Sequence, residues 1–312
     1  MTLRATVIIA AYKAADVLPR SIASAQRQTG ADIEVIVVDD ASMDDTFAIA
    51  RANPNVTAIS LDHNSGPAAA RNRTIDAATG DWIVVLDADD TMRPDRIADM
   101  AAVADTAGAD VVLGNFIRVD GDETPIDPGP FLAENEVDPA QPVTLESYVA
   151  ANAMTPDSRN YGYLKPMFRR EFLDRHKIRY DETLRNSEDY HIVLALLAAG
   201  AKVVISPRPD YLYQVSAGSI SHRVAPALIA RLIEADDRFE RRLGAARTPT
   251  LTDLFAQRRL NLTNMMHAES VLQAIKDRRL TAAVAMLAAR PRTVARVFRQ
   301  ICEAIKNRLV PS

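Results

Sequence analysis

An apolar strand that ends in acids constrains this chain more than any other feature. The segment WIVVLDADD, residues 82–90, has five mostly β-branched apolar residues that lead to Asp87, Asp89 and Asp90. Like charges this close resist joint ionisation, and hard cations such as Mg²⁺ or Mn²⁺ are the usual partners of clustered carboxylates. A cation held in this way is how proteins handle the diphosphate of a nucleotide. The run therefore indicates a metal-assisted site, with an acidic turn after a buried strand as the alternative.

The same pattern occurs earlier in the chain and predicts a parallel sheet. EVIVVDDAS, residues 34–42, is a second apolar run that ends in paired acids, and residues 5–12 form another apolar run. Continuous apolar runs are typical of strands buried on both faces of a helix-covered parallel sheet. Further helix and strand patterns fill the intervals, at residues 14–28, 45–52 and 56–61.

This alternation of strand and helix predicts a doubly wound α/β fold with a mostly parallel central sheet flanked by helices. In such sheets, ligands bind beyond the carboxyl ends of the strands. Both acidic clusters lie at that end, so we expect one site to contain them.

Composition and charge narrow the class of protein further. The 312 residues suffice for a full core with an appended element, no apolar run approaches the 20 residues of a membrane span, and the single cysteine fits a reducing cytoplasm. Residues 1–110 carry 9 Lys or Arg against 17 Asp or Glu, whereas residues 223–312 carry 17 against 8. The acidic part needs cations to work, and the basic part suggests an anionic partner surface. No zinc-finger spacing or aromatic-basic signature points to nucleic acid.

Four segments together resemble the family-2 inverting glycosyltransferases of the GT-A fold. They occur in the family's order within residues 5–222, and they are VIIAAYKAADVLPRSIASAQRQT, VVDDASMDDT, NSGPAAARNRTIDAATGDWIVVLDADD and LKPMFRREFLDRHKIRYDETLRNSEDYHIVLALLAAG. The third segment contains an Asp-x-Asp motif, and the last contains Glu-Asp. Within that family, these segments are most similar to those of bacterial enzymes that build exopolysaccharides.

The resemblance implies a GT-A, Rossmann-like catalytic domain over residues 1–222 and a helical C-terminal region over residues 223–312. It implies a metal-dependent inverting glycosyltransferase, of the hexosyltransferase class, that acts in surface polysaccharide synthesis. The donor would be a nucleotide-diphosphate sugar, with UDP as the default nucleotide. The acceptor would be a saccharide or a polyprenyl-linked oligosaccharide.

The metal site implied by the resemblance contains Asp89 and Asp87 with Mn²⁺ or Mg²⁺, and His222 is a candidate further ligand. Asp90 would support them from behind, or cap a helix that starts near Arg93. Gln214 occupies a position where the family often has Arg, which leaves the last ligand open. His222 also reads as a plain surface loop residue.

Nucleotide contacts carried over from the family are Ala10, Tyr12, Asp40, Arg71 and Asp87. An Asp can accept the N–H of uracil, and a Tyr ring can stack on it. A turn-capping Asp40, a strand-end Tyr12 and an Arg71 ion pair with a nearby acid are the structural alternatives.

Glu188 and Asp189 precede an apolar helical run. An inverting transfer needs a base that takes the proton of the acceptor hydroxyl, and the resemblance gives that role to Asp189, with Glu188 orienting it or contacting the acceptor. The alternative is that both acids only favour a helix N-terminus.

The last residues predict an amphipathic helix with basic flanks. Its apolar stripe consists of Val294, Val297, Phe298, Ile301, Ile305 and Leu309. Such a helix suits contact with the inner face of the plasma membrane, in line with a lipid-linked acceptor. Packing on the catalytic domain or on a second copy in a homodimer is the alternative.

Two other functions are open to a chain of this kind. A nucleotide-sugar-binding protein without catalysis would carry the same donor motifs, although Asp189 argues against it. A receiver-type signalling domain also has paired acids and a later Asp, but it needs a Lys after a later strand. No Lys occurs between Lys13 and Lys165, and this weighs against the receiver.

Overall fold

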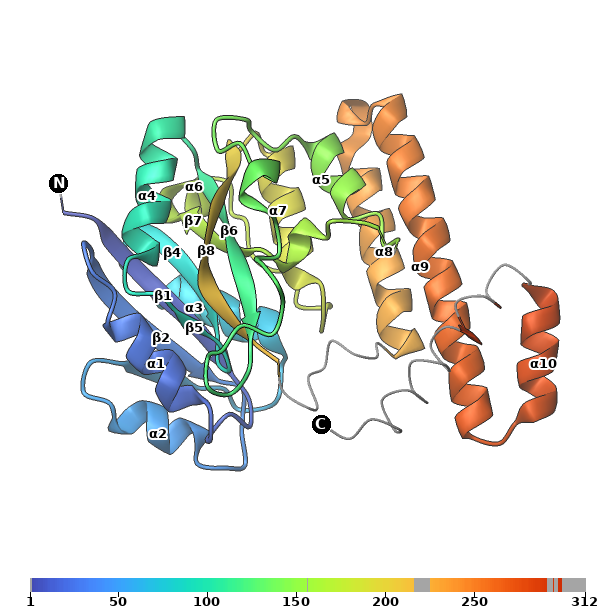
Figure 1. Ribbon diagram of the computed structural model, residues 1–312, viewed down its shortest axis with the longest axis horizontal. Helices are drawn as coiled ribbons and strands as arrows, with labels where there is room; N and C mark the ends of the chain where they lie inside the picture. The colour runs from blue at the N-terminus through green and yellow to red at the C-terminus, as the bar shows by residue number, and fades with distance from the viewer. Residues whose placement is uncertain (1, 156, 216–224, 291–293, 295–296, 299–312) are drawn as a thin grey trace. The chain divides into compact units, whose positions relative to one another are not determined.

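The computed structural model describes residues 2–155, 157–215, 225–290, 294 and 297–298. They form two compact units (Figure 1), one made of Met1–Ala151 and Arg159–Ala217, the other of Asn152–Ser158 and Gly218–Ser312. None of the helices in the described ranges has the length and apolar character needed to cross a bilayer.

The first unit contains an eight-stranded mixed sheet with the order β3-β2-β1-β4-β7-β6-β8-β5. Its strands are β1 Arg4–Ala11, β2 Asp32–Asp39, β3 Thr57–Ser60, β4 Trp82–Asp87, β5 Thr91–Met92, β6 Val111–Val119, β7 Lys165–Arg169 and β8 Val203–Gln214. Its helices are α1 Leu18–Gln26, α2 Thr46–Ala52, α3 Pro67–Ala77, α4 Arg96–Ala107, α5 Leu145–Ala151, α6 Arg170–Arg175 and α7 Glu188–Ala198. Short 3₁₀ turns lie at Glu134–Glu136 and Tyr161–Tyr163.

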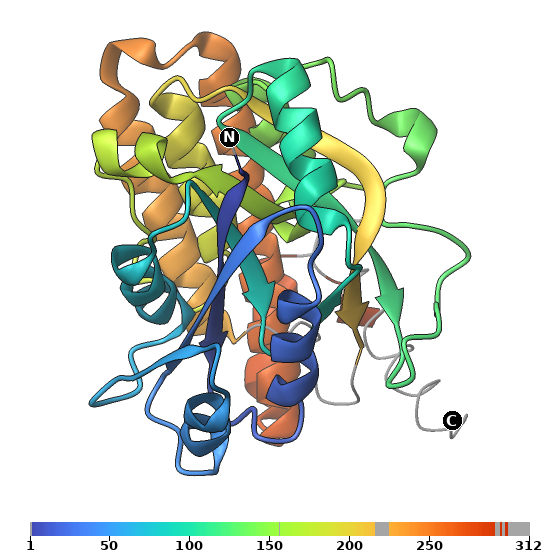
Figure 2. The same cartoon turned by 90° about the vertical axis from the view of Figure 1, so that its left-hand side faces the viewer.

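The parallel half of the sheet confirms the fold predicted from the apolar runs. Strands β3, β2, β1 and β4 are all parallel, and the chain reverses its winding direction between β3 and β4. Because right-handed crossovers place their helices according to winding direction, α1 and α2 cover one face and α3 covers the other (Figure 2). The helix expected at residues 14–28 starts only at Leu18, with Pro19 in its first turn.

The other half of the sheet is mixed. Strand β7 runs antiparallel to both β4 and β6, and β6 is parallel to β8. The β6–β8 register shifts between Gly114 and Phe116, where Asn115 faces four residues of β8. Asn115 is fully buried and bonds the backbone of Leu132 and Pro207, which stabilises this bulge.

A buried ion pair fixes the bulge to helix α4. Arg96 and Asp210 are almost fully buried and contact each other, and the Arg96 side chain passes so close to Gly114 that a Cβ there would overlap the guanidinium. The bulge lets the second half of β8 continue toward the end of β4, and it therefore helps to build the site described below.

The second unit consists mainly of helices. They are α8 Pro226–Leu243, α9 Pro249–Lys276 and α10 Leu280–Ala289, with a 3₁₀ turn at Gly244–Ala246. Ile229 and Leu232 of α8 pack with Leu262 and Met265 of α9. The buried Arg258 of α9 pairs with Asp236 of α8 at 2.8 Å, so two helices share both an apolar contact and a buried charge pair.

Candidate functional site

The predicted site residues of the first half of the chain meet at one edge of the sheet. Register places Asp87 of β4 level with Ala10 of β1, and Ala11 level with Asp39 of β2. Tyr12 and Asp40 follow directly. This is the carboxyl end of the parallel strands, next to the point where winding reverses, which is where ligands bind in open α/β sheets.

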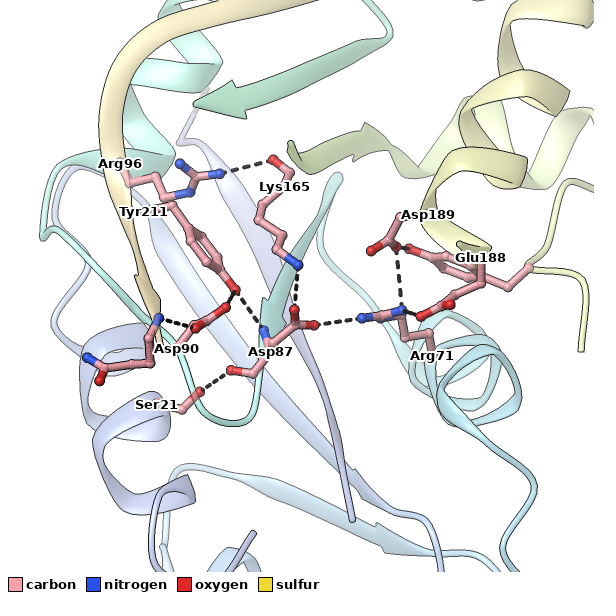
Figure 3. Close-up of polar contacts among 11 residues, drawn as sticks. Ser21, Arg71, Asp87, Asp90, Arg96, Lys165, Glu188, Asp189 and Tyr211 are labelled. Carbon is pink, nitrogen blue, oxygen red and sulfur yellow. Dashed lines mark hydrogen bonds and ion pairs between the residues drawn. The ribbon is translucent and has the colours of Figure 1, made fainter. Parts of the chain in front are cut away.

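Two cations hold the Asp87 carboxylate (Figure 3). Lys165 Nζ donates to Oδ2 at 2.5 Å, and Arg71 Nη2 donates to Oδ1 at 2.6 Å. Burial alone would raise the pKa of Asp87, but Lys165 and Arg71 outweigh it and hold that pKa well below its usual range. Asp87 is therefore ionised, with both oxygens engaged.

Arg71 connects Asp87 to the Glu188–Asp189 pair. Its Nη1 donates to Glu188 Oε1 at 2.5 Å and lies 3.4 Å from Asp189 Oδ1. Gly66, with a φ of 93°, and Pro67 start helix α3 and place Arg71 one turn into it. The ion pair with nearby acids, which was the structural alternative for Arg71, is thus present. Contact between Arg71 and a donor stays a prediction.

A second contact fixes helix α3 to the chain that leads into α7. The Asn72 side chain donates to the Tyr180 backbone carbonyl at 3.0 Å and accepts from the Tyr180 N–H at 2.8 Å. The Tyr180 hydroxyl in turn donates to Asp189 Oδ1 at 3.1 Å. Two adjacent residues of α3 therefore both help to position Asp189.

Glu188 and Asp189 lie in the first turn of α7, as the sequence pattern indicated. Neither is solvated like an ordinary helix-start acid, because both are buried. Burial raises the pKa of Glu188, and Arg71 opposes part of that rise. Buried carboxylates that share one arginine are unusual for mere helix N-terminal residues, so this geometry favours a functional role for the pair.

The other two acids of the Asp-x-Asp run have different environments. Asp90 is buried, and it accepts from the Tyr211 hydroxyl at 2.6 Å and from the Gln214 backbone N–H at 2.7 Å. It supports the strand end from behind. The alternative helix-cap role is wrong, because helix α4 starts at Arg96 with Asp95 in the N-cap position.

Asp89 fits a metal ligand better than any other acid of the run. It is exposed, and no other residue that the structure describes gives its carboxylate a hydrogen bond or ion pair. Desolvation and the neighbouring Asp87 raise its pKa, so a cation would stabilise its ionised form. No preformed cluster of three or more His, Cys, Asp or Glu ligands occurs among the described residues. His222 and its neighbours lie outside them.

At the nucleotide end, Tyr12 and Asp40 differ in availability. Tyr12 is 46% exposed, and Lys13 Nζ lies 5.2 Å from the centre of its ring. The Asp40 carboxylate is buried and accepts from the side chain of Asn64 and from the backbone N–H groups of Ser65 and Gly66, at 2.6–2.9 Å. The structure therefore favours the turn-capping alternative for Asp40. Asp39 accepts from the Ser42 N–H, as expected of a structural residue.

Sequence reasoning missed three residues of this site, Lys165, Tyr180 and Tyr211. Lys165 lies in the last of the four segments that resemble the family, but that resemblance gives it no role of its own. The signal that could have identified it is a lysine at the start of an apolar strand-like segment, where a charge needs a partner. The partners of the two tyrosines depend on long-range packing and leave no local pattern.

Comparison with known proteins finds a matching family and two similar relatives. The model of glycosyl transferase family 2 matches residues 6–176. The succinoglycan biosynthesis protein ExoO of Rhizobium meliloti is 41% identical over 241 residues, 76% of this chain and 68% of that protein. ExoU of the same organism is 35% identical over 240 residues, 74% and 67%.

Solved structures with low sequence identity share the fold. S. aureus TarS in complex with UDP-GlcNAc has a TM-score of 0.67 at 20% identity, over 96% of this chain and 92% of that chain. The mannosyltransferase PcManGT of Pyrobaculum calidifontis, in complex with GDP-Man and Mn²⁺, has a TM-score of 0.58 at 18% identity, over 98% and 87%.

Replacing Arg71 tests the charge network without any substrate. Arg71→Met should lower the free energy of unfolding by about 3–5 kcal/mol, because it leaves buried acids without their shared cation. Urea unfolding measures this. Arg73→Met, on the exposed face of the same helix, is the control and should change it by less than about 0.5 kcal/mol. Equal effects of the two variants would contradict the network.

Proposed function

The chain belongs to glycosyltransferase family 2, and we propose that it transfers a sugar from a nucleotide-diphosphate donor, with UDP as the nucleotide, to an acceptor hydroxyl with inversion at the anomeric carbon. The observation that carries the proposal is the Arg71 bridge. It holds the acidic end of β4 next to the buried acids of α7. Arg71 thus links the proposed donor-binding edge to the proposed base.

Asp189 is the proposed base. As the acceptor oxygen attacks the anomeric carbon, its proton passes to the Asp189 carboxylate, and the bond between that carbon and the diphosphate breaks. The Tyr180 hydroxyl and Arg71 orient the carboxylate. Glu188 fixes the Arg71 guanidinium by accepting a hydrogen bond from its Nη1.

Asp89, with Asp87 nearby, is the proposed holder of a divalent cation, Mn²⁺ or Mg²⁺. When bound, that ion would neutralise the charge that grows on the diphosphate leaving group. The exposed Asp89 carboxylate with its raised pKa supports this role, and so does the Mn²⁺ in the related fold of PcManGT. His222 stays a prediction as a further ligand.

For the donor, we propose that Tyr12 stacks on the base and that the backbone near Ala10 lines the nucleotide site. UDP is supported by the UDP-GlcNAc complex of TarS, whereas PcManGT carries GDP-Man. Because Asp40 already caps the turn at Asn64–Gly66, its proposed contact to uracil is limited to one remaining lone pair on Oδ1.

The biological process that we propose is surface polysaccharide synthesis in the cytoplasm, with a saccharide or a lipid-linked saccharide as acceptor. Two relatives that are named for succinoglycan biosynthesis support it. The receiver alternative does not agree with a mixed eight-stranded sheet. A chain that binds a nucleotide sugar without turnover is the remaining alternative.

Contact with an anionic membrane surface is part of this proposal. Leu280, Val284, Val294 and Phe298 are four of the nine large apolar side chains that are exposed in the described part of the chain. Residues 276–299 carry seven Lys or Arg and one Asp. Exposed apolar groups among basic residues suit an anionic lipid interface. Of the predicted stripe, Val297 is buried in a cluster with Ala268 and Val271, whereas Val294 and Phe298 are exposed. Ile301, Ile305 and Leu309 lie outside the described residues.

Vesicle co-sedimentation tests the membrane contact. The chain should bind phosphatidylglycerol vesicles and not phosphatidylcholine vesicles, because the contact combines charge with apolar insertion. Val284→Asp should abolish this binding, and Leu260→Asp, which changes another exposed apolar side chain, on α9, should not. Equal binding by all three proteins would exclude this surface, and loss of self-association in Val284→Asp would indicate a homodimer contact in its place.

Replacing Asp189 tests the reaction. Asp189→Asn should retain binding of the UDP-sugar and lower kcat by about 10²–10⁴-fold, because only the base is removed. Glu171→Gln, which changes an exposed acid in the first turn of α6, should leave kcat unchanged. Turnover like the wild type in Asp189→Asn would rule out this base. UDP binding without turnover in the wild type would indicate the non-catalytic alternative.

A further inference from the structure

Lys165 is a buried cation for which neither the sequence motifs nor the proposed reaction has a role. Only 6% of it is exposed, and its Nζ donates to Asp87 Oδ2 at 2.5 Å. The rings of Tyr211 and Tyr213 lie 5.7 Å from the same nitrogen. A charge buried to this extent requires a fixed partner, and Asp87 is that partner.

The sheet itself determines where Lys165 lies. Lys165 is the first residue of β7, and β7 runs antiparallel to β4. The start of β7 therefore lies beside the end of β4, where Asp87 is located. Arg96 adds a bond to the Lys165 carbonyl at 3.0 Å. Lys165 thus belongs to a central strand rather than to a loop, so the sheet fixes the backbone from which its ammonium group reaches Asp87.

The contacts of Asp87 transmit this position to the acids of α7 (Figure 3). Lys165 occupies Oδ2 and leaves Oδ1 to Arg71. The other terminal nitrogen of Arg71 reaches both Glu188 and Asp189. The backbone of Asp87 is held as well, since its N–H donates to the Tyr211 hydroxyl and its carbonyl accepts from Ser21. The orientation of the carboxylate is then set by Lys165 on Oδ2 and by Arg71 on Oδ1.

We propose that Lys165 is a positioning residue for sugar transfer, which fixes Asp87 and, through Arg71, the orientation of Asp189 relative to the strand ends. This inference rests on the proposed function for the identity of Asp189 as the base. Lys165 is too buried to contact substrate, so its effect is indirect. Its loss would let the Asp87 carboxylate turn, and Arg71 would follow its partner away from the α7 acids.

A double-mutant cycle in stability tests the connection without any activity assay. Among the described residues no hydrogen bond or ion pair joins Lys165 to Glu188, and the hydrogen-bonded path between them runs through Asp87 and Arg71. The shifts in unfolding temperature of Lys165→Met and Glu188→Gln should therefore fail to add, by about 2 °C or more. The control pair, Lys165→Met with Glu171→Gln, should add. Additivity of both pairs would overturn the proposal.

Steady-state kinetics then separates positioning from a purely structural role. Lys165→Met should lower kcat by about 10²-fold, because a small displacement of a catalytic group has effects of that size, while KM for the donor stays close to that of the wild type. Lys165→Arg, which keeps the charge, should recover most of kcat. A change confined to KM, or an unchanged kcat, would overturn the proposal.

The two experiments also distinguish this inference from the proposed function. A wild type that transfers no sugar would refute the proposed function, whereas the cycle would still decide whether Lys165 is coupled to the α7 acids. If Lys165→Met does not fold, Lys165→Gln, which also removes the charge, replaces it in the same cycle, where additivity would again be the contrary result.

Discussion

The pairing of Asp87 with two cations is the interaction on which the rest of the site depends. Asp87 ends β4, Lys165 starts β7, and Arg71 belongs to α3, so one carboxylate connects three elements that are far apart in sequence. Arg71 adds α7 as a fourth element. Loss of Asp87 would leave two buried cations without their common partner, which costs far more than an exposed ion pair contributes.

The balance of charge in this network explains why the site suits a cation and a diphosphate together. Lys165 and Arg71 face five carboxylates, those of Asp87, Asp89, Asp90, Glu188 and Asp189. Burial and the neighbouring acids raise the pKa of Asp90, and burial raises that of Glu188, although Arg71 opposes part of the latter rise. Asp89 is the exposed member of the set, and its ionised form is the one that a metal ion stabilises. The cations are held inward on Asp87, and the acid at the surface is available for a ligand.

Much of the fold and part of the site could be predicted from the sequence. The apolar runs that end at Asp39 and Asp87 are continuous and are followed by acids, so the parallel strands and the acidic edge follow from local pattern. Gly66-Pro67 likewise predicts the helix start that places Arg71. The roles of the individual acids could not be obtained in this way, because they depend on which distant donors reach each oxygen. Asp40 shows this best, since the same residue suits uracil or a turn, and only the fold reveals the N–H groups around it.

The arrangement of strands β6, β7 and β8 could not be predicted from local sequence patterns, because it depends on contacts between residues that are far apart in the chain. Strand β7 carries Pro166, which cannot donate to a sheet ladder, and its antiparallel direction is set by pairing with β4 and β6 rather than by its own residues. The β8 bulge depends on Asn115 and on the Arg96–Asp210 pair, which are remote in sequence. Lys165 is placed by both features, so its role could emerge only from the folded chain.

Calorimetric titration with UDP, with and without Mn²⁺, on the wild type and on Asp89→Ala tests the central claim most directly. If the acidic edge is a metal-assisted donor site, the wild type should bind UDP only when Mn²⁺ is present, and Asp89→Ala should weaken that binding by about tenfold or more. Absence of UDP binding under every condition, or equal binding by both proteins without the metal, would contradict it.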